Sequence, residues 1–294
     1  MRITILTNTD SKWGLSRDAK IVSDLLLARG HEVAIADFRN PPTGQKAHVN
    51  IHLEIKAGRW FNHAIRNVLV PNQEWFPTEW IPQSLLRYHG VFCKTHHAYD
   101  IYKALGFKNT VYTGFTSLDF AHTDVEKQPT CYHIAGNSMF KGTQYILANW
   151  QPDWPTIYVY GANEAHKTYF DQNKKPNVVC KYGYMSEHEM IQTVNRHTWA
   201  IQPSASEGFG HCIAEPLSAG LQVVTLDAPP MNEFTPTQKL PAKQIGKHHL
   251  GNMYAPIGFN IDFTAVNPDT RKWWVENDMA FRSRFVEYLE RLVK

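Results

Sequence analysis

The stretch from Trp199 to Phe234 decides the fold and reads WAIQPSASEGFGHCIAEPLSAGLQVVTLDAPPMNEF. The apolar run that ends at Pro203 predicts a short strand, because proline cannot extend a hydrogen-bonded ladder. Polar residues follow, and a helix is expected to begin near Gly208–His211 and to end at Gly220. The apolar residues 222–226 predict the next strand. This order of strand, loop, helix and strand is typical of an α/β protein with a parallel sheet.

The loop and the helix start predict a ligand site. A helix N-terminus presents unpaired backbone N–H groups and the positive end of the helix dipole, which favour an anionic or hydroxyl-rich ligand. Glu207 precedes the turn, and Glu215 follows about two helical turns later. Two carboxylates placed in this way can hold hydroxyl groups at opposite ends of an elongated ligand. Spacing alone leaves a second interpretation, an ordinary strand–helix–strand unit with one solvated glutamate and one on the helix surface.

The sequence Glu207-Gly-Phe-Gly, followed by Glu215 and Ala219-Gly220, resembles the donor-site signature of retaining GT-B glycosyltransferases of the family-4-like group (glycosyltransferase group 1). The resemblance implies that Glu207 is catalytic and binds sugar hydroxyls beside the reaction centre. It implies that Glu215 holds the ribose of the nucleotide. The backbone that faces the sugar and the phosphate is then that of Phe209, Gly210 and His211.

The same resemblance implies an α/β GT-B fold, in which two doubly wound parallel-sheet (Rossmann-like) domains face a cleft. Residues 1–124 are expected to form the acceptor-side domain and residues 125–270 the nucleotide-sugar donor domain. Residues 271–294 are expected to form a C-terminal helix that crosses back to the first domain. A length of 294 residues with 43% hydrophobic content suits two cores of ordinary size. The chain contains no apolar run of the ~18–20 residues that a membrane-spanning helix needs.

The first predicted strand, residues 2–7, is followed by a polar loop that contains Gly14. This loop lacks the three spaced glycines of a dinucleotide site, which argues against a nicotinamide enzyme. The GT-B resemblance implies that the loop around Gly14 faces the donor phosphates. The other interpretation is a solvent-exposed loop with one turn glycine.

Polar and aromatic side chains follow two later strands of the first domain. The predicted strand 67–71 leads into Asn72, Glu74 and Trp75. Ligands of open α/β sheets gather at the carboxyl ends of parallel strands, so Asn72 and Glu74 are expected to be catalytic and Trp75 to lie on the acceptor side. The predicted strand 90–95 places Lys94 and His97 there as well. Because adjacent side chains point apart on a helix or strand, the pair His96–His97 does not predict a metal chelate.

On the donor side, residues 136–142 resemble the phosphate-binding turn of the family, and Lys141 matches the lysine that clamps the diphosphate. Asn137 and Ser138 occupy the place of the family's arginine, so half of the cationic clamp is missing. The resemblance also implies that Tyr184 and Met185 border the nucleotide base.

These features predict a glycosyltransferase that moves a sugar from a nucleotide-sugar to an acceptor hydroxyl with retention of configuration. We expect neither a cofactor nor an essential metal, because no Asp-x-Asp pair is present and helix ends with Lys141 can stabilise the departing diphosphate. The leading acceptor is a glycan, a lipid or a small molecule. The alternative is a 5-hydroxymethylpyrimidine in DNA, which the 14 Lys/Arg against 11 Asp/Glu in residues 1–124 permit.

A rival of another class is a nucleotide-sugar-binding module without catalysis, motivated by the missing arginine. The four cysteines are dispersed, and the N-terminus turns polar too soon for a signal peptide. We therefore expect a cytoplasmic protein, located in the host cytoplasm if a virus encodes it.

Overall fold

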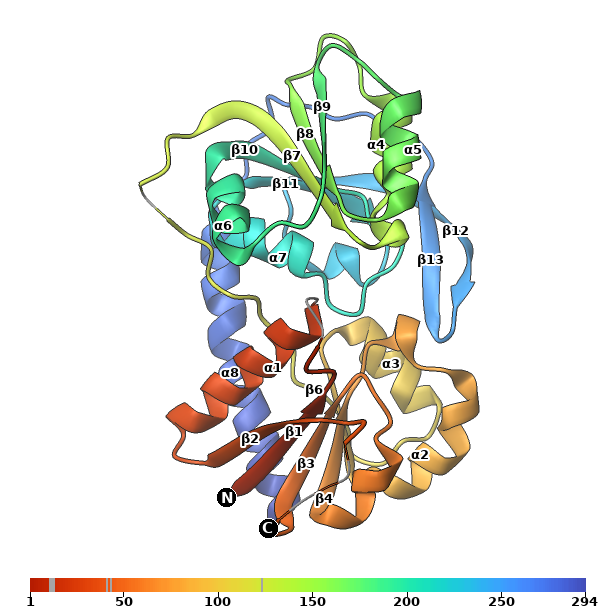
Figure 1. Ribbon diagram of the computed structural model, residues 1–294, viewed down its shortest axis with the longest axis vertical. Helices are drawn as coiled ribbons and strands as arrows, with labels where there is room; N and C mark the ends of the chain where they lie inside the picture. The colour runs from red at the N-terminus through yellow and green to blue at the C-terminus, as the bar shows by residue number, and fades with distance from the viewer. Residues whose placement is uncertain (11–13, 41, 43, 123) are drawn as a thin grey trace. The chain divides into compact units, whose positions relative to one another are not determined.

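The computed structural model describes residues 1–10, 14–40, 42, 44–122 and 124–294 (Figure 1). The chain divides into two compact units, and each unit is built on its own sheet. Unit 1 comprises Met1–Leu118, Lys247–Gly251 and Glu276–Lys294. Unit 2 comprises Asp119–Gly246 and Asn252–Val275.

Unit 1 contains a six-stranded sheet in the order β2-β1-β3-β4-β5-β6, and its strand pairs are parallel. The chain leaves β1 for β2 on one side and returns to β3 on the other, so the topological switch point lies between β1 and β3. Ligands of doubly wound sheets bind at the carboxyl ends of the strands at such a point. The strands are β1 (Arg2–Thr7), β2 (Glu32–Asp37), β3 (Ala47–Leu53), β4 (Ala64–Val70), β5 (Gly90–Cys93) and β6 (Thr110–Tyr112).

The helices of unit 1 connect these strands. α1 (Gly14–Ala28) buries Ile21, Val22, Leu25 and Leu26, whose spacing places them on one face of the helix. α2 covers Ile81–Arg87. α3 (His96–Ala104) begins at Thr95, whose Oγ1 accepts a hydrogen bond of 3.0 Å from the N–H of Ala98.

Unit 2 contains a seven-stranded sheet in the order β13-β12-β11-β10-β7-β8-β9. The chain runs outward from β7 through β8 to β9 and then returns to β10, on the other side of β7. The switch point of this sheet therefore lies between β7 and β10. The strands are β7 (Gln128–Gly136), β8 (Ile157–Gly161), β9 (Val178–Tyr182), β10 (His197–Gln202), β11 (Gln222–Asp227), β12 (Gln238–His248) and β13 (Gly251–Pro256).

Four α-helices of unit 2 join or follow these strands, namely α4 (Thr143–Asn149), α5 (Glu164–Gln172), α6 (Glu187–Arg196) and α7 (His211–Ser218). α6 begins with a capping box, in which Ser186 and Glu189 exchange side-chain-to-backbone hydrogen bonds. β12 and β13 form a hairpin that the sequence pattern did not predict (Figure 1).

The C-terminal residues form one continuous helix, α8 (Thr270–Val293). Residues Glu276–Lys294 belong to unit 1, where Phe281 and Phe285 are fully buried. Phe281 packs on Phe115 with ring centroids 4.9 Å apart, and Phe285 packs on Phe92 at 5.3 Å. The expected C-terminal helix is confirmed. None of the helices within the described ranges is long and apolar enough to cross a membrane.

Each sheet holds a fully buried neutral histidine. In β3 of unit 1, His52 contacts the Asn67 side chain at 3.2 Å and the N–H of Ala57 at 3.4 Å. In β7 of unit 2, His133 Nδ1 donates to the carbonyl oxygen of Ile201 at 2.7 Å, and its Nε2 accepts from Thr143 at 2.9 Å. Burial lowers the pKa of each imidazole to about 4.

We predict that both units lose stability as the pH falls from 6.5 to 4. The unfolded chain takes up protons on these imidazoles below pH 6.5, whereas the folded protein keeps them neutral until about pH 4. The free energy of unfolding should therefore fall by on the order of 3 kcal/mol for each histidine. Urea unfolding of His133→Gln should show a shallower pH dependence than the wild type, and the exposed control His188→Gln should not. Identical pH dependence in the wild type and His133→Gln would contradict this account.

Candidate active site

An ion pair at the switch point of unit 2 joins the two predicted donor-site elements. Lys141 follows β7 and Glu207 follows β10, and Lys141 Nζ donates to Glu207 Oε1 at 2.5 Å. The Glu207 side chain is 8% exposed, and the Lys141 side chain is 20% exposed. The Glu207 side chain is therefore buried, whereas part of the Lys141 side chain is exposed to solvent.

A close backbone contact sets the position of this pair. Gly142 has a φ of 76°, and a Cβ at this position would collide with the carbonyl oxygen of Pro203. Two residues on, the N–H of Ala205 donates to the carbonyl oxygen of Phe140 at 2.7 Å. The turn that carries Lys141 thus packs directly on the loop that carries Glu207, and only glycine fits between them.

Cys212, in the first turn of α7, extends the pair. Its Sγ lies 3.3 Å from Glu207 Oε1 and 3.7 Å from both Lys141 Nζ and Ser204 Oγ. Burial and the neighbouring Glu207 raise the pKa of the Cys212 thiol to about 12, so the thiol is protonated and donates to the carboxylate. Sequence reasoning missed Cys212 and Ser204, although both lie within five residues of Glu207.

Glu207 is ionised despite its burial. Burial opposes the negative charge, but the charge of Lys141 and its hydrogen bond outweigh burial and hold the pKa of Glu207 below its ordinary value. An ionised carboxylate is a strong hydrogen-bond acceptor, which suits it to bind hydroxyl groups.

α7 begins at His211, within the range Gly208–His211 that the sequence predicted. Gly210 has a φ of 117°, and a Cβ there would lie 3.2 Å from the ring of Phe234. Phe209 is buried against Phe234, with ring centroids 5.4 Å apart, and also contacts the ring of His211. The aromatic packing fixes the turn at the positive end of the helix dipole.

Glu215 lies one helical turn beyond Cys212 in α7 and is 4% exposed. Burial and the negative charge of Glu215 raise the pKa of Tyr132 well above its ordinary value, so Tyr132 of β7 lies near Glu215. The structure therefore brings Lys141, Glu207, Phe209, Gly210, His211 and Glu215 together around the loops after β7 and β10.

The turn after β7 holds no cation in place of the family's arginine. Asn137 is exposed, and its carbonyl oxygen accepts from the Asn163 side chain at 3.1 Å. Ser138 Oγ accepts from the N–H of Phe140 at 3.1 Å. His166 of α5 is fully buried and packs against Gly161 at the end of β8. A Cβ added to Gly161 would lie 2.5 Å from Nδ1 of His166. These contacts stabilise the turn without adding a positive charge.

Tyr184 and Met185 lie in the loop between β9 and α6. Tyr184 is 67% exposed, and Met185 is partly buried.

Two of the residues predicted in unit 1, Lys94 and Asn72, contact each other. Lys94 is buried, forms an ion pair with Asp18 and donates to Asn72 Oδ1 at 2.8 Å. Glu74 is buried and packs against Gly251. A Cβ added to Gly251 would lie 2.7 Å from the Cβ of Glu74. Its carbonyl oxygen accepts from His248 Nδ1 at 2.5 Å.

The remaining candidates of unit 1 are Trp75, His97 and Gly14. Trp75 is 46% exposed and packs edge-on against His248, with ring centroids 4.7 Å apart. His97 is partly buried in the first turn of α3, and burial lowers its pKa. Gly14 is exposed at the first residue of α1.

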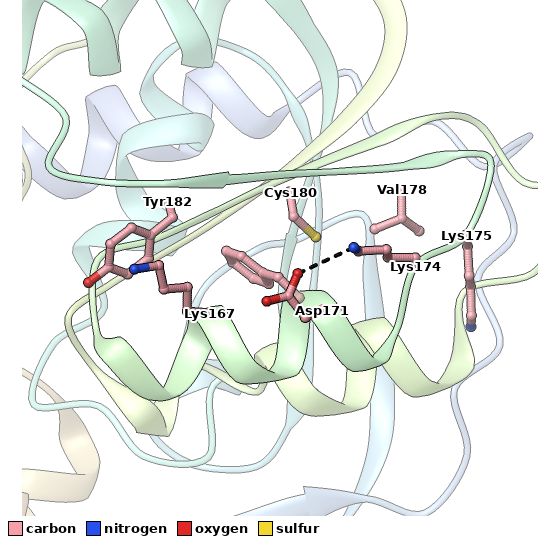
Figure 2. Close-up of a pocket in the computed structure, with 8 residues that line it drawn as sticks. Lys167, Asp171, Lys174, Lys175, Val178, Cys180 and Tyr182 are labelled. Atoms are coloured by element: carbon pink, nitrogen blue, oxygen red, sulfur yellow. Dashed lines mark ion pairs between the residues drawn. The ribbon is translucent and has the colours of Figure 1, made fainter.

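A separate surface hollow of about 450 Å³ lies between α5 and β9 of unit 2 (Figure 2). Lys167, Lys174, Lys175 and Asp171 line it, and Lys174 pairs with Asp171 at 3.4 Å. None of the predicted donor-site residues contributes to this hollow. In the part of the chain that the structure describes, no group of three or more His, Cys, Asp and Glu side chains is arranged to hold a metal ion.

Comparison with solved structures establishes the fold. A glycosyltransferase from Rickettsia africae matches with a TM-score of 0.71, over 100% of this chain and 98% of that chain, at 10% sequence identity. Anabaena HepE in complex with UDP and glucose matches with a TM-score of 0.67, over 99% and 100% of the two chains, at 13% identity. A UDP-N-acetylglucosamine 2-epimerase matches with a TM-score of 0.53, over 98% and 95%, at 13% identity. The sequence matches no protein-family model and no curated protein.

The chain therefore has the GT-B fold that the sequence predicted. Identities of 10–13% establish the fold alone, and the epimerase shows that this fold carries more than one activity. The activity has to be argued from the site.

We predict that Gly142→Ala destabilises unit 2 by roughly 2–5 kcal/mol. The energetic cost of a left-handed backbone at alanine adds to the cost of the collision between the new Cβ and Pro203. The matched control is Gly30→Ala, since Gly30 has a φ of 77° and nothing within 4 Å of the added Cβ. It should cost only about 1 kcal/mol. Urea denaturation measures both values, and equal costs would show that the Gly142–Pro203 contact does not constrain the turn.

Proposed function

We propose that the protein transfers a sugar from a nucleoside diphosphate sugar to an acceptor hydroxyl, with retention of configuration at the anomeric carbon. The observation that carries this proposal is the Lys141–Glu207 pair, which lies at the start of α7 with Glu215 in the same helix. A cation for phosphate, a carboxylate for sugar hydroxyls and a second buried carboxylate for ribose are the three contacts that such a donor requires. HepE, whose structure contains UDP and glucose, has the same fold.

In this proposal the donor lies across the loops that follow β7 and β10. Lys141 and the N-terminus of α7 stabilise the negative charge that develops on the diphosphate as its bond to the sugar breaks. Glu207 accepts hydrogen bonds from the sugar hydroxyls, and its negative charge stabilises the positive charge that develops on the sugar ring. Tyr184 stacks on the base and Glu215 holds the ribose.

The same residues suit two other activities, and one experiment separates the three. A binding module without catalysis is motivated by the absence of a cation at Asn137 and Ser138. An epimerase is motivated by the matched epimerase fold. A thermal-shift screen of nucleotides and nucleotide-sugars identifies the donor, since a ligand at ~100 times its dissociation constant adds about 2.7 kcal/mol. The selected donor is then incubated with the protein, and the products are resolved by chromatography.

Release of free nucleoside diphosphate and sugar supports the transferase, because many transferases use water slowly as an acceptor. An epimerised nucleotide-sugar supports the epimerase, and an unchanged donor supports the binding module. The anomer of the first sugar product, measured by NMR, tests retention.

We predict that Glu215→Gln weakens nucleotide binding by about 10-fold to 100-fold and leaves the protein folded. Replacing a charged hydrogen-bond acceptor by a neutral one costs roughly 1.5–3 kcal/mol. Isothermal titration with the nucleotide chosen by the screen measures the affinity. Glu187→Gln, at an exposed glutamate of α6, is the control. Unchanged affinity in folded Glu215→Gln would remove Glu215 from the nucleotide site.

We also predict that the reaction survives chelation. Lys141 and the helix N-terminus supply the positive charge that a metal ion supplies in other transferases. The rate should be the same in EDTA and in added magnesium or manganese. A rate that EDTA abolishes and a divalent cation restores would contradict the metal-independent mechanism.

The leading acceptor is a glycan, a lipid or a small molecule, and unit 1 is proposed to bind it. A second candidate, a hydroxymethylated base in DNA, is favoured by the β12–β13 hairpin. Residues 238–261 contain no Asp or Glu, and Lys239, Lys243 and Lys247 are exposed there. Labelled donor is offered with hydroxymethylated DNA, unmodified DNA or a glycolipid extract. Label in hydroxymethylated DNA alone, with binding that weakens steeply as salt rises, supports the DNA acceptor.

A further inference from the structure

A hollow of about 660 Å³ lies at the amino ends of three strands of unit 1. β4 begins at Ala64, β5 at Gly90 and β6 at Thr110, and residues near these starts line the hollow together with the C-terminal turns of α2 and α8. Because the strands are parallel, their amino ends share one edge of the sheet, and the carboxyl ends at the switch point lie at the opposite edge. All of the lining residues belong to unit 1.

The charged side chains that line the hollow are all cations, namely Arg66, Lys108 and Arg291. Arg291 pairs with Glu287 of the same helix at 2.6 Å. Within the described ranges, neither Arg66 nor Lys108 pairs with a carboxylate. The hollow therefore contains two positive charges that no acidic side chain of the described chain neutralises.

The Arg66 guanidinium is fixed in place and still has donors to offer. Its Nε donates to the carbonyl oxygen of Leu292 at 3.2 Å, near the end of α8, and Nη1 donates to the carbonyl oxygen of Ile65 at 3.5 Å. A guanidinium has five N–H donors, and both of these acceptors are neutral. In the described part of the chain its other N–H groups have no protein acceptor, so they are available to a ligand.

His89 adds a neutral donor to the lining. The N–H of Asn67 donates to His89 Nδ1 at 3.1 Å, and burial together with the charge of Arg66 lowers the pKa of the imidazole. The ring is therefore neutral at pH 7, and its proton is on Nε2. Asn109 Nδ2 donates to the His89 carbonyl oxygen at 2.8 Å, which joins the loops before β5 and β6 and preorganises this side of the hollow.

The rest of the lining is mostly apolar. Phe92 is 2% exposed and lies with its ring centroid 6.4 Å from that of Tyr288. Leu86 of α2 is 86% exposed. The other apolar residues of the lining are Leu85, Val111 and Leu292. An apolar group in the hollow would remove the Leu86 side chain from water, which is favourable.

We propose that this hollow binds an amphiphilic anion, a small molecule with an aliphatic or aromatic body and a phosphate or carboxylate head. The head pairs with Arg66 and Lys108, because a guanidinium forms paired hydrogen bonds with such oxygens. The body lies on Leu86 and Phe92. The volume is within the roughly 300–1,000 Å³ of small-molecule sites. None of the residues proposed to hold the sugar donor lines the hollow, so the site does not depend on the proposed transfer.

The experiment measures the binding of octyl phosphate, octanoate and phenyl phosphate to the full chain by isothermal titration, below any micellar concentration. Inorganic phosphate tests the head alone, and octylammonium tests the body with the opposite charge. The variants are Lys108→Glu and Leu86→Ser, both at exposed positions. Lys46→Glu is the matched control, since Lys46 is an exposed lysine of unit 1 that does not line the hollow. The melting temperature shows that each variant is folded.

The wild type should bind at least one of the three amphiphilic anions with one molecule per chain. Inorganic phosphate should bind at least about 10-fold more weakly, and octylammonium should not bind. Lys108→Glu should weaken the binding of the best anion by at least about 10-fold, since repulsion replaces attraction. Leu86→Ser should weaken it by about 10-fold, and Lys46→Glu should leave it unchanged. Excess UDP should not displace the anion.

A wild type that binds none of the three anions overturns the proposal. Binding that persists in folded Lys108→Glu and Leu86→Ser overturns it as well, and so does displacement by UDP, because either result places the anion elsewhere. Vesicles of phosphatidylcholine with phosphatidic acid are the last test. Association with these vesicles, without binding of the free anions, would show a membrane contact in place of a small-molecule site.

Discussion

Unit 2 depends on a contact between two backbones, that of Gly142 and that of Pro203. This contact brings the turn after β7 against the loop after β10, and the ion pair of Lys141 and Glu207 forms across it. A buried ion pair repays its desolvation only when its geometry is good and its remaining atoms are satisfied. Here Cys212 gives the carboxylate a further hydrogen bond, and backbone contacts on both sides fix the approach.

The architecture was largely readable from the sequence, because hydrophobic runs and turn residues are local signals. The unit around Glu207 has the predicted order of strand, loop, helix and strand, and the C-terminal helix is present. The β12–β13 hairpin was missed, since its exposed residues lack the alternation of a half-buried strand. The contact of Lys141 with Glu207 joins residues 66 positions apart, which only the sheet order brings together. The left-handed conformation of Glu54 was not predictable either, because glutamate rarely adopts a positive φ.

The two sheets place polar groups by the same rule. In each, the chain leaves one strand, runs outward, and returns on the other side of that strand, so two loops diverge above the switch point. In unit 2 the diverging loops carry Lys141 and Glu207. In unit 1, Glu54 follows β3, which lies on the other side of β1 from β2. Asn72 follows β4 and Lys94 follows β5. Of the polar residues that sequence reasoning placed after β4 and β5, Asn72 and Lys94 contact each other, and Glu74 packs against Gly251.

A lysine acts on a glutamate in both units, and in unit 1 the Asn72 amide lies between the two side chains. Lys141 contacts Glu207 directly at 2.5 Å, and its charge holds the pKa of that carboxyl below the ordinary value. Lys94 donates to Asn72 and pairs with Asp18, and its charge offsets the effect of burial on Glu54 only in part, so the pKa of Glu54 rises to about 7. The first arrangement fixes a permanent negative charge, which suits a group that binds hydroxyls. The second leaves a carboxyl whose pKa lies near neutral pH.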